Sequence, residues 1–156
     1  LESLDKYYEY TINDDCTINI IRCINYKDIM NIPFRTYKVT HDAFSESKSK
    51  MDRLSTGSGC KVLEEGAFRG LRVVELIIGD NINELPSFTS TSKELKKLVV
   101  PKNVNMIREN AFSQTGLKEV GLYLNFGKYE NQKVGLPFNI PFKKGYIQNS
   151  IISSSK

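Results

Sequence analysis

The residues best suited to catalytic chemistry are one histidine and its acidic neighbour. His41 is the only imidazole in the chain, and it directly precedes Asp42. An imidazole beside a carboxylate is a pairing used in general acid–base catalysis. No serine or cysteine motif accompanies it, however, and the V-T-H-D-A-F segment around His41 is explained by a repeated turn, as shown below. We therefore predict no catalytic residue and no enzyme; the opposing hypothesis needs further titratable groups converging on His41.

The three cysteines, Cys16, Cys23 and Cys60, do not form a recognisable redox or metal motif. Their number is odd and no pair has the CxxC spacing, which indicates neither a disulfide framework nor a zinc site. We expect them to pack as small apolar residues. With one histidine no metal ligand set is predicted, and no Gly-rich phosphate loop is present, so no cofactor is expected.

Composition indicates one soluble globular domain. The net charge of +4 arises from 22 basic and 18 acidic residues that are interleaved along the chain, which gives little support to nucleic-acid binding. The longest apolar run, around Val73 to Ile78, contains Glu75 and is far short of a membrane span, so we expect no membrane insertion. The chain begins at Leu1 without a secretory apolar segment, and we expect a processed or engineered N-terminus.

The elements that position these residues follow a period of 22. Counting 22 residues forward from Met51 gives Val73, Leu95 and Leu117, and each begins a row with apolar residues in the same places, apart from mild departures at Thr56 and Tyr129. The rows are Met51, Leu54, Thr56, Cys60, Leu63, Phe68; Val73, Leu76, Ile78, Ile82, Leu85; Leu95, Leu98, Val100, Val104, Ile107, Phe112; and Leu117, Val120, Leu122, Phe126, Tyr129. A fixed period in the twenties is typical of stacked units that share a continuous core.

An Ala-Phe pair ends most of these units. It occurs as Ala43-Phe44, Ala67-Phe68 and Ala111-Phe112, whereas the Val73 row has Phe88 two places early. We therefore expect a different turn in that row. Each L-x-x-L-x-L segment fits a short strand, and stacking would place the strands about 4.8 Å apart in a parallel sheet.

One further column precedes the fourth apolar position of each row. It contains Gly59, Asn81, Asn103 and Asn125. Because Gly and Asn tolerate a positive φ, we interpret the column as a repeated left-handed turn.

The segment from 95 to 112, L-x-x-L-x-V-P-x-x-V-x-x-I-x-x-x-A-F, resembles the BspA-type leucine-rich repeats of bacterial and protist surface proteins. The resemblance extends from about Ile32 to Tyr129, and its most specific part is Ile107 to Phe112, with copies at 39–44 and 63–68. It implies a β-rich α/β solenoid: a right-handed superhelix with a parallel sheet on one face and short turns or helical pieces on the other.

The N-terminal segment resembles the cap of that family. Tyr8, Tyr10 and Ile12 alternate with polar residues, and Asn13 to Cys16 form a turn signal. After the turn, Ile18 and Ile20 again alternate with polar residues. A hairpin here would cover the apolar end of the stack. We predict a hairpin cap at 1–31, repeats at 32–130, and a degenerate Pro- and Phe-containing cap with a polar tail at 131–156.

Binding is the more promising activity, because the x positions of the strands form columns on the outer face of the sheet. The columns read Asp52, Val74, Lys96, Lys118; then Arg53, Glu75, Lys97, Glu119; then Ser55, Ile77, Val99, Gly121. The face thus combines alternating charges with an apolar strip of Val74, Ile77 and Val99. We predict binding through the strip and through Arg53, Glu75, Lys96, Lys97, Lys118 and Glu119.

Alternatives remain for both features. The charges also fit a solvated face on which neighbours neutralise one another, each pair contributing at most about 1 kcal/mol. The strip needs burial by a partner, by the C-terminal tail or by another copy. A nucleic-acid site would use Lys96, Lys97, Lys102 and Lys118, but Glu75 and Glu119 lie among them and only Tyr123 offers an aromatic platform.

The family resemblance implies a secreted or cell-surface protein that binds a host-cell or matrix protein, with a cell-surface glycan as the other ligand class. We expect the chain to be a monomer. The second hypothesis is a structural spacer within a larger surface protein, which would bind nothing itself.

Overall fold

The computed structural model describes residues 3–45 and 47–117, and the main chain of 119–122. The cap and tail expected at 131–156 lie outside these residues. The elements are α1 (Leu4–Tyr7), β1 (Tyr8–Ile12), β2 (Ile18–Cys23), β3 (Ile29–Asn31), β4 (Thr36–Val39), β5 (Met51–Ser55), β6 (Val62–Leu63), β7 (Val73–Ile77), β8 (Glu84–Leu85), β9 (Lys97–Val100), β10 (Met106–Ile107) and β11 (Glu119–Leu122).

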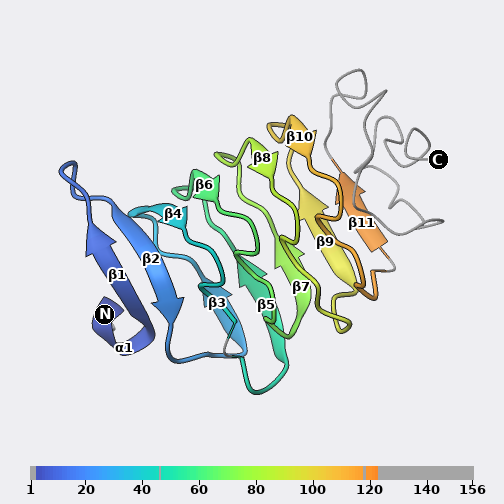
Figure 1. The fold of residues 1–156 in the computed structure, drawn as a ribbon, viewed down its shortest axis with the longest axis horizontal. Helices are drawn as coiled ribbons and strands as arrows, with labels where there is room; N and C mark the ends of the chain where they lie inside the picture. The colour runs from blue at the N-terminus through green and yellow to red at the C-terminus, as the bar shows by residue number, and fades with distance from the viewer. Residues whose placement is uncertain (1–2, 46, 118, 123–156) are drawn as a thin grey trace.

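The strands stack into a solenoid, and this confirms the predicted fold class (Figure 1). One face is the five-stranded parallel sheet β3-β5-β7-β9-β11. The returning segments carry β4, β6, β8 and β10, and β2 and β1 extend this second side beyond β4. Among the described residues the returning segments contain turns and these short strands but no helix. The one described helix, α1, precedes the repeats.

The register of the sheet follows the predicted period. Arg53 pairs with Glu75, and Glu75 pairs with Lys97, so hydrogen-bonded neighbours are 22 residues apart. The first turn of the solenoid is longer, because Ile29 pairs with Arg53 and Val39 with Leu63. Its two additional residues lie between Phe44 and Met51, in an exposed loop that does not alter the strands on either side.

Side chains in each strand alternate between core and surface as the L-x-x-L-x-L pattern predicts. In β7 and the residue after it, Val73, Leu76 and Ile78 are buried, whereas Val74 and Ile77 are only half-buried. The same alternation holds in β5 and around β9. The apolar template positions therefore form the core, and the x positions form the outer face of the sheet.

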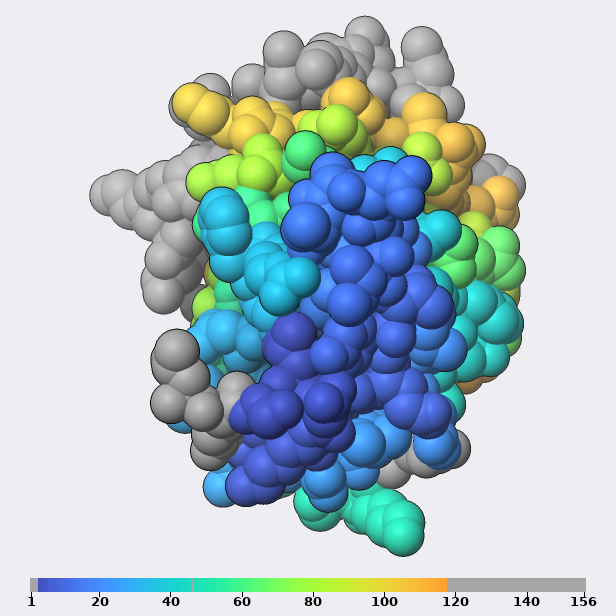
Figure 2. All heavy atoms as spheres, turned by 90° about the vertical axis from the view of Figure 1, so that its left-hand side faces the viewer, coloured from blue at the N-terminus to red at the C-terminus, as the bar shows by residue number. Residues whose placement is uncertain are grey.

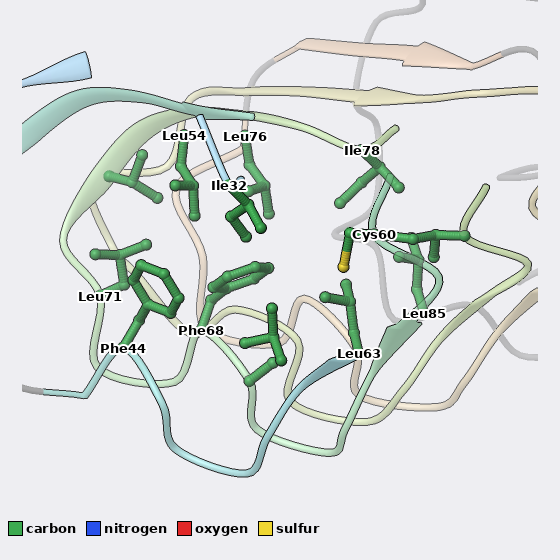
Figure 3. Close-up of a cluster of buried hydrophobic side chains, with 14 of the residues drawn as sticks. Ile32, Phe44, Leu54, Cys60, Leu63, Phe68, Leu71, Leu76, Ile78 and Leu85 are labelled. Atoms are coloured by element: carbon green, nitrogen blue, oxygen red, sulfur yellow. The ribbon is translucent and has the colours of Figure 1, made fainter. Parts of the chain in front are cut away.

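Phenylalanines of the Ala-Phe pairs occupy the centre of the solenoid. Phe44, Phe68 and Phe112 are fully buried, and the Phe44 and Phe68 rings meet edge to face with centroids 5.3 Å apart. Figure 3 shows these two rings among the aliphatic side chains that line the interior. Removing such a ring typically costs about 3–5 kcal/mol of stability, so each pair anchors its own turn of the stack.

The predicted hairpin cap is present. β1 and β2 pair antiparallel around a turn at Asn13–Cys16, and β2 pairs parallel with β4, so the hairpin continues the stack (Figure 2). Tyr8 is 5% exposed, and its ring contacts Phe44 with centroids 6.3 Å apart. The alternation does not persist through β1, because the register shifts between Glu9 and Tyr10, and Ile12 is 63% exposed.

The column of Gly59, Asn81 and Asn103 does not adopt a positive φ, so the predicted left-handed turn is wrong. The two asparagines instead donate side-chain hydrogen bonds to the previous turn: Asn81 Nδ2 to the Ser58 carbonyl, and Asn103 Nδ2 to the Asp80 carbonyl over 2.8 Å. At Gly59 the chains approach so closely that a Cβ would lie 1.8 Å from the Phe34 carbonyl oxygen. This column therefore joins successive turns of the solenoid. Asn125 lies outside the described residues.

The left-handed column lies just before the Ala-Phe pairs. It comprises Asp42, Gly66, Phe88 and Asn110, with φ of 56°, 72°, 55° and 65°. The turn of the Val73 row differs, as predicted: its Thr89 hydroxyl donates to the Pro86 carbonyl over 2.6 Å, whereas Ala67 and Ala111 use their main-chain N–H for the equivalent bond. Phe88 occupies the left-handed position, and the Arg69 guanidinium lies 4.8 Å from its ring centroid.

Candidate functional site

The outer face of the five-stranded sheet brings the predicted columns together. Ile29, Arg53, Glu75, Lys97 and Glu119 are consecutive neighbours in one column. Asn31, Ser55, Ile77, Val99 and Gly121 form the next. Within each column, successive residues lie on adjacent strands about 4.8 Å apart, so their side chains are close enough to interact.

The charged column contains a direct ion pair. Arg53 Nε lies 3.1 Å from Glu75 Oε1, with the two side chains 47% and 26% exposed. Lys97 follows on the next strand and is exposed. A partly exposed pair of this kind contributes at most about 1 kcal/mol to stability, so these charges are available to a ligand at small cost to the fold.

The apolar strip crosses the middle of the same face. Ile77 and Val99 are paired in register, and the Lys96 N–H donates to the Val74 carbonyl over 2.8 Å, which places Lys96 beside Val74. Val74, Ile77 and Val99 are each half-buried. Glu75 lies between Val74 and Ile77 along β7, so the strip is shallow and interrupted by the charged column. Its members are less exposed than Ile12, Ile29 and Phe34 nearer the N-terminus.

A second ion pair lies at the entrance to these strands. Arg72 precedes β7, and its Nη2 lies 2.8 Å from Glu94 Oε1, while Nη1 donates to the Lys48 carbonyl over 3.1 Å. The Arg72 hydrogen bond is the main reason that the pKa of Glu94 is lowered. Because this group has a depressed folded-state pKa, its contribution is present at neutral pH and is lost as the pH falls. Three successive turns are thus connected at one side of the face.

His41 lies away from this face, in the left-handed turn before Ala43. Its Nδ1 is 2.5 Å from the Glu65 carbonyl oxygen and its Nε2 is 2.9 Å from Asp42 Oδ2. One ring nitrogen thus contacts a carboxylate of its own turn, and the other contacts a main-chain carbonyl of the next turn. Among the described residues no group of three or more His, Cys, Asp or Glu side chains is placed to hold a metal ion.

Two of the cysteines are packed in the core as expected, and the third is not. Cys23 and Cys60 are fully buried, and burial raises the pKa of each thiol to about 12. Cys16 is exposed at the tip of the hairpin, where it has a φ of 69°. The packing interpretation is wrong for Cys16 because the turn needs a left-handed residue at a position beyond the end of the core.

Sequence analysis missed two members of the sheet face, Ile29 and Asn31. Both belong to β3, which lies within the range predicted as the cap but is the first strand of the repeat sheet. The longer first turn places them outside a strict 22-residue register. The available signal in the sequence was the apolar pair Met30 and Ile32 on either side of polar Asn31; in the structure both are buried.

The remaining predicted residues are only partly placed. Lys118 and Tyr123 lie outside the described residues, and Glu119 is placed through its main-chain pairing with Lys97. Lys102 is exposed in the turn after β9, away from the columns. Of the predicted charged column, Arg53, Glu75 and Lys97 are thus fully described, with Glu75 between the two cations.

The repeats, the stacking and the cap together define a leucine-rich-repeat solenoid. The chain belongs to the BspA-type leucine-rich repeat family, whose repeat region matches residues 12–132 in six copies. Members of this family serve as interaction or surface modules, and none of the described helices is long and apolar enough to cross a bilayer.

Two solved structures share the fold. A leucine-rich cell-surface protein from Faecalibacterium prausnitzii is 18% identical with a TM-score of 0.62, and the match covers 74% of this chain and 32% of that protein. A leucine-rich repeat protein from T. pallidum is 20% identical with a TM-score of 0.54, covering 91% of this chain and 86% of that one. The chain thus spans about a third of the length of the first. No curated protein matches the sequence.

Proposed function

We propose that this chain is a non-enzymatic interaction module that binds a protein ligand through the outer face of its five-stranded sheet. The observation that carries the proposal is the pairing of Ile77 with Val99 directly beside the Arg53–Glu75–Lys97 column. Branched apolar side chains next to alternating charges, on a surface with a fixed spacing, are what a protein partner needs for both burial and register.

The charge pattern favours a protein over a polyanion. Arg53 and Lys97 lie on either side of Glu75 in one column, so the column has no run of a single sign. A nucleic acid or an acidic glycan gains most from uninterrupted cations, because its phosphate or sulfate groups are all negative. A protein surface can match alternating signs, which also excludes partners in the wrong register.

The ligand we propose is a host-cell or extracellular-matrix protein, which makes the chain adhesin-like and places it at the cell surface or in the secreted fraction. The support is associational: the family, and the description of the Faecalibacterium prausnitzii neighbour as a cell-surface protein. We further propose that the chain acts as a monomer.

The test is binding of the purified chain to immobilised matrix proteins and to epithelial cells, compared with a Val74→Glu/Ile77→Lys/Val99→Glu variant. We expect saturable binding by the unmodified chain and loss of at least about tenfold in affinity for the variant, because charges replace the apolar band. Circular dichroism and a denaturation midpoint establish that the variant is folded.

The matched control is Tyr37→Glu. Tyr37 is a partly exposed apolar residue of β4, on the other side of the solenoid, and the substitution changes the net charge by the same amount as the triple variant. Retained binding by Tyr37→Glu with loss by the triple variant supports the sheet face. Equal binding by all three proteins contradicts it.

A second candidate function is a structural spacer, and the half-burial of the strip is the observation that favours it. Since Val74, Ile77 and Val99 are already partly shielded, the face does not require a partner for its stability. The spacer hypothesis predicts no saturable binding by the unmodified chain or by either variant in the same assay.

A further inference from the structure

At the N-terminal end of the molecule, the five-stranded sheet ends differently from the four-stranded sheet β1-β2-β4-β6 on the return side. On the return side, β2 and β1 continue the stack beyond β4. On the sheet side, the last strand is β3, and among the described residues it pairs with β5 alone. Figure 2 views this end, which the hairpin and α1 cross. The outer edge of β3 is therefore open in the sense that no described strand pairs with it, although α1 lies nearby.

The main-chain groups at this edge can be assigned from the bonds that β3 makes. The Asp28 carbonyl accepts the Arg53 N–H over 3.1 Å, and the Ile32 N–H donates to the Ser55 carbonyl over 2.9 Å. Main-chain groups of a strand alternate between its two neighbours, so the even-numbered residues of β3 face β5. The N–H and C=O groups of Ile29 and Asn31 consequently point away from the sheet.

A hollow lies against this open edge. It has a volume of about 230 Å³ and is bounded by α1 and by all three residues of β3. Leu4, Tyr7 and Pro33 supply apolar walls, and Ile29 is 50% exposed. Among the described residues that line it, Lys27 alone is charged; its Nζ lies 4.7 Å from the centroid of the Tyr7 ring.

We propose that the open edge of β3 binds a peptide segment of a partner protein as an added β-strand. The segment would be extended, would carry an apolar side chain for the hollow, and would carry an acidic side chain opposite Lys27. Main-chain hydrogen bonds to Ile29 and Asn31 would supply the affinity, and the hollow and the lysine would supply the selectivity. Ile29 and Asn31 are also the first members of the two sheet-face columns. The edge site is nevertheless distinct, because it uses their outward-pointing main-chain groups, whereas the sheet-face site uses side chains.

The experiment begins with a displayed library of random linear peptides, roughly ten residues long so that each can form one strand. The library is selected on the immobilised chain, and enriched peptides are synthesised with a fluorescent label. Their affinities are measured by fluorescence anisotropy. We expect enriched peptides to alternate β-branched or aromatic residues with polar ones and to contain an acidic residue.

The decisive variant is Ile29→Pro. Proline removes the outward-pointing N–H of Ile29 and is compatible with an edge strand, so the fold is retained while one hydrogen bond to the peptide is lost. We expect at least about a fivefold loss of affinity, as one such bond contributes about 1 kcal/mol. Ile29→Val keeps the N–H and should bind normally, and circular dichroism checks both variants.

Two further measurements make the result unambiguous. Methylation of alternate main-chain nitrogens in the best peptide should abolish binding, and Lys27→Glu should weaken it. Any of three outcomes overturns the proposal: equal affinity for Ile29→Pro and Ile29→Val, retention of binding by the methylated peptide, or failure to enrich any peptide. So does an oligomer that dissociates on Ile29→Pro in sedimentation, since a second copy would then occupy the edge. The Val74→Glu/Ile77→Lys/Val99→Glu variant should bind the peptide normally, which separates this test from that of the sheet face.

Discussion

At the scale of single residues, position in the stack determines the chemistry of identical side chains. Cys23 and Cys60 are fully buried, and each thiol has a weak hydrogen bond to a nearby carbonyl, of Asn25 and Val62 respectively. Cys16 has the same functional group at an exposed hairpin tip. Burial penalises a thiolate because the charged form loses its hydration, and only the thiolate reacts readily.

We therefore expect one cysteine to react with a thiol reagent at pH 8 in the folded protein, and three in denaturant. Burial raises the pKa of Cys23 and Cys60 to about 12, so at pH 8 both remain neutral as well as inaccessible. The measurement is a count of modified thiols by mass spectrometry.

Cys16→Ser is the control, and it should leave no thiol that reacts in the folded state. Rapid modification of Cys23 or Cys60 under native conditions would contradict the burial. The same shift has a stability consequence with a definite sign. Since the folded-state pKa exceeds the ordinary value of 9.0, the stabilisation is complete below pH 9 and is lost as the pH rises towards 12.

At the scale of elements, the closeness of successive turns is set by residues without a side chain. A Cβ on Gly79 would lie 1.8 Å from the Gly57 carbonyl oxygen, one turn earlier, and Gly57 itself has a φ of 71°. Where side chains are present at a neighbouring column, as in Asn81 and Asn103, they reach the previous turn by hydrogen bonds instead. Contact between turns is thus made by main-chain approach and by amide groups.

Gly79→Ala should lower the free energy of unfolding by about 1–3 kcal/mol, because the two turns must separate to admit the methyl group. Chemical denaturation measures the change.

Ser58→Ala serves as the comparison, since the Ser58 side chain is exposed and the substitution should stay within about 0.5 kcal/mol. A Gly79→Ala protein as stable as Ser58→Ala would show that the turns are not held at this spacing.

The predictability of the elements has a physical limit that these residues illustrate. Strands and core positions follow from apolar periodicity, because burial acts on every turn in the same way, and Leu54, Leu76 and Leu98 lie where the period places them. Residue type alone suggested a left-handed turn at the column of Gly59 and Asn81, but neither residue adopts a positive φ. Close approach between turns is a tertiary effect, and no local sequence signal reports it.

The candidate site was predicted in its columns but not in its extent. Arg53, Glu75 and Lys97 follow from the period, whereas Ile29 and Asn31 were missed because two additional residues in the loop before β5 shift the first turn. The depth of the apolar strip could not be predicted either. Half-burial of Val74 depends on the side chains of adjacent strands, which only the assembled sheet specifies.

At the scale of the whole molecule, the N-terminal cap completes an aromatic chain of contacts. Tyr8 and Tyr26 both contact Phe44, with ring centroids 6.3 and 6.2 Å away, and Phe44 contacts Phe68. The cap therefore shields the apolar interior of the first turn from water, as terminal units of repeat proteins must.

Tyr8→Ala should destabilise the protein by about 3 kcal/mol or more, since it removes a buried ring at the end of the core. Ile12→Ala, in the same strand, should change stability by less than about 0.5 kcal/mol because Ile12 is 63% exposed.

Thermal and denaturant unfolding of the two variants provides the measurement. If both variants lost the same stability, the cap would contribute through its hairpin alone and not through contact with Phe44.

The constant offset between paired strands also bears on how such a protein changes length over generations. Arg53, Glu75 and Lys97 are neighbours because each turn consumes the same number of residues as the last. An in-frame duplication of one such stretch of coding sequence would insert a strand into the sheet and a side chain into every column. The turns on either side would pair with a copy of the turn that they already contact, so a lineage can lengthen or shorten the sheet through copying errors that leave the fold intact.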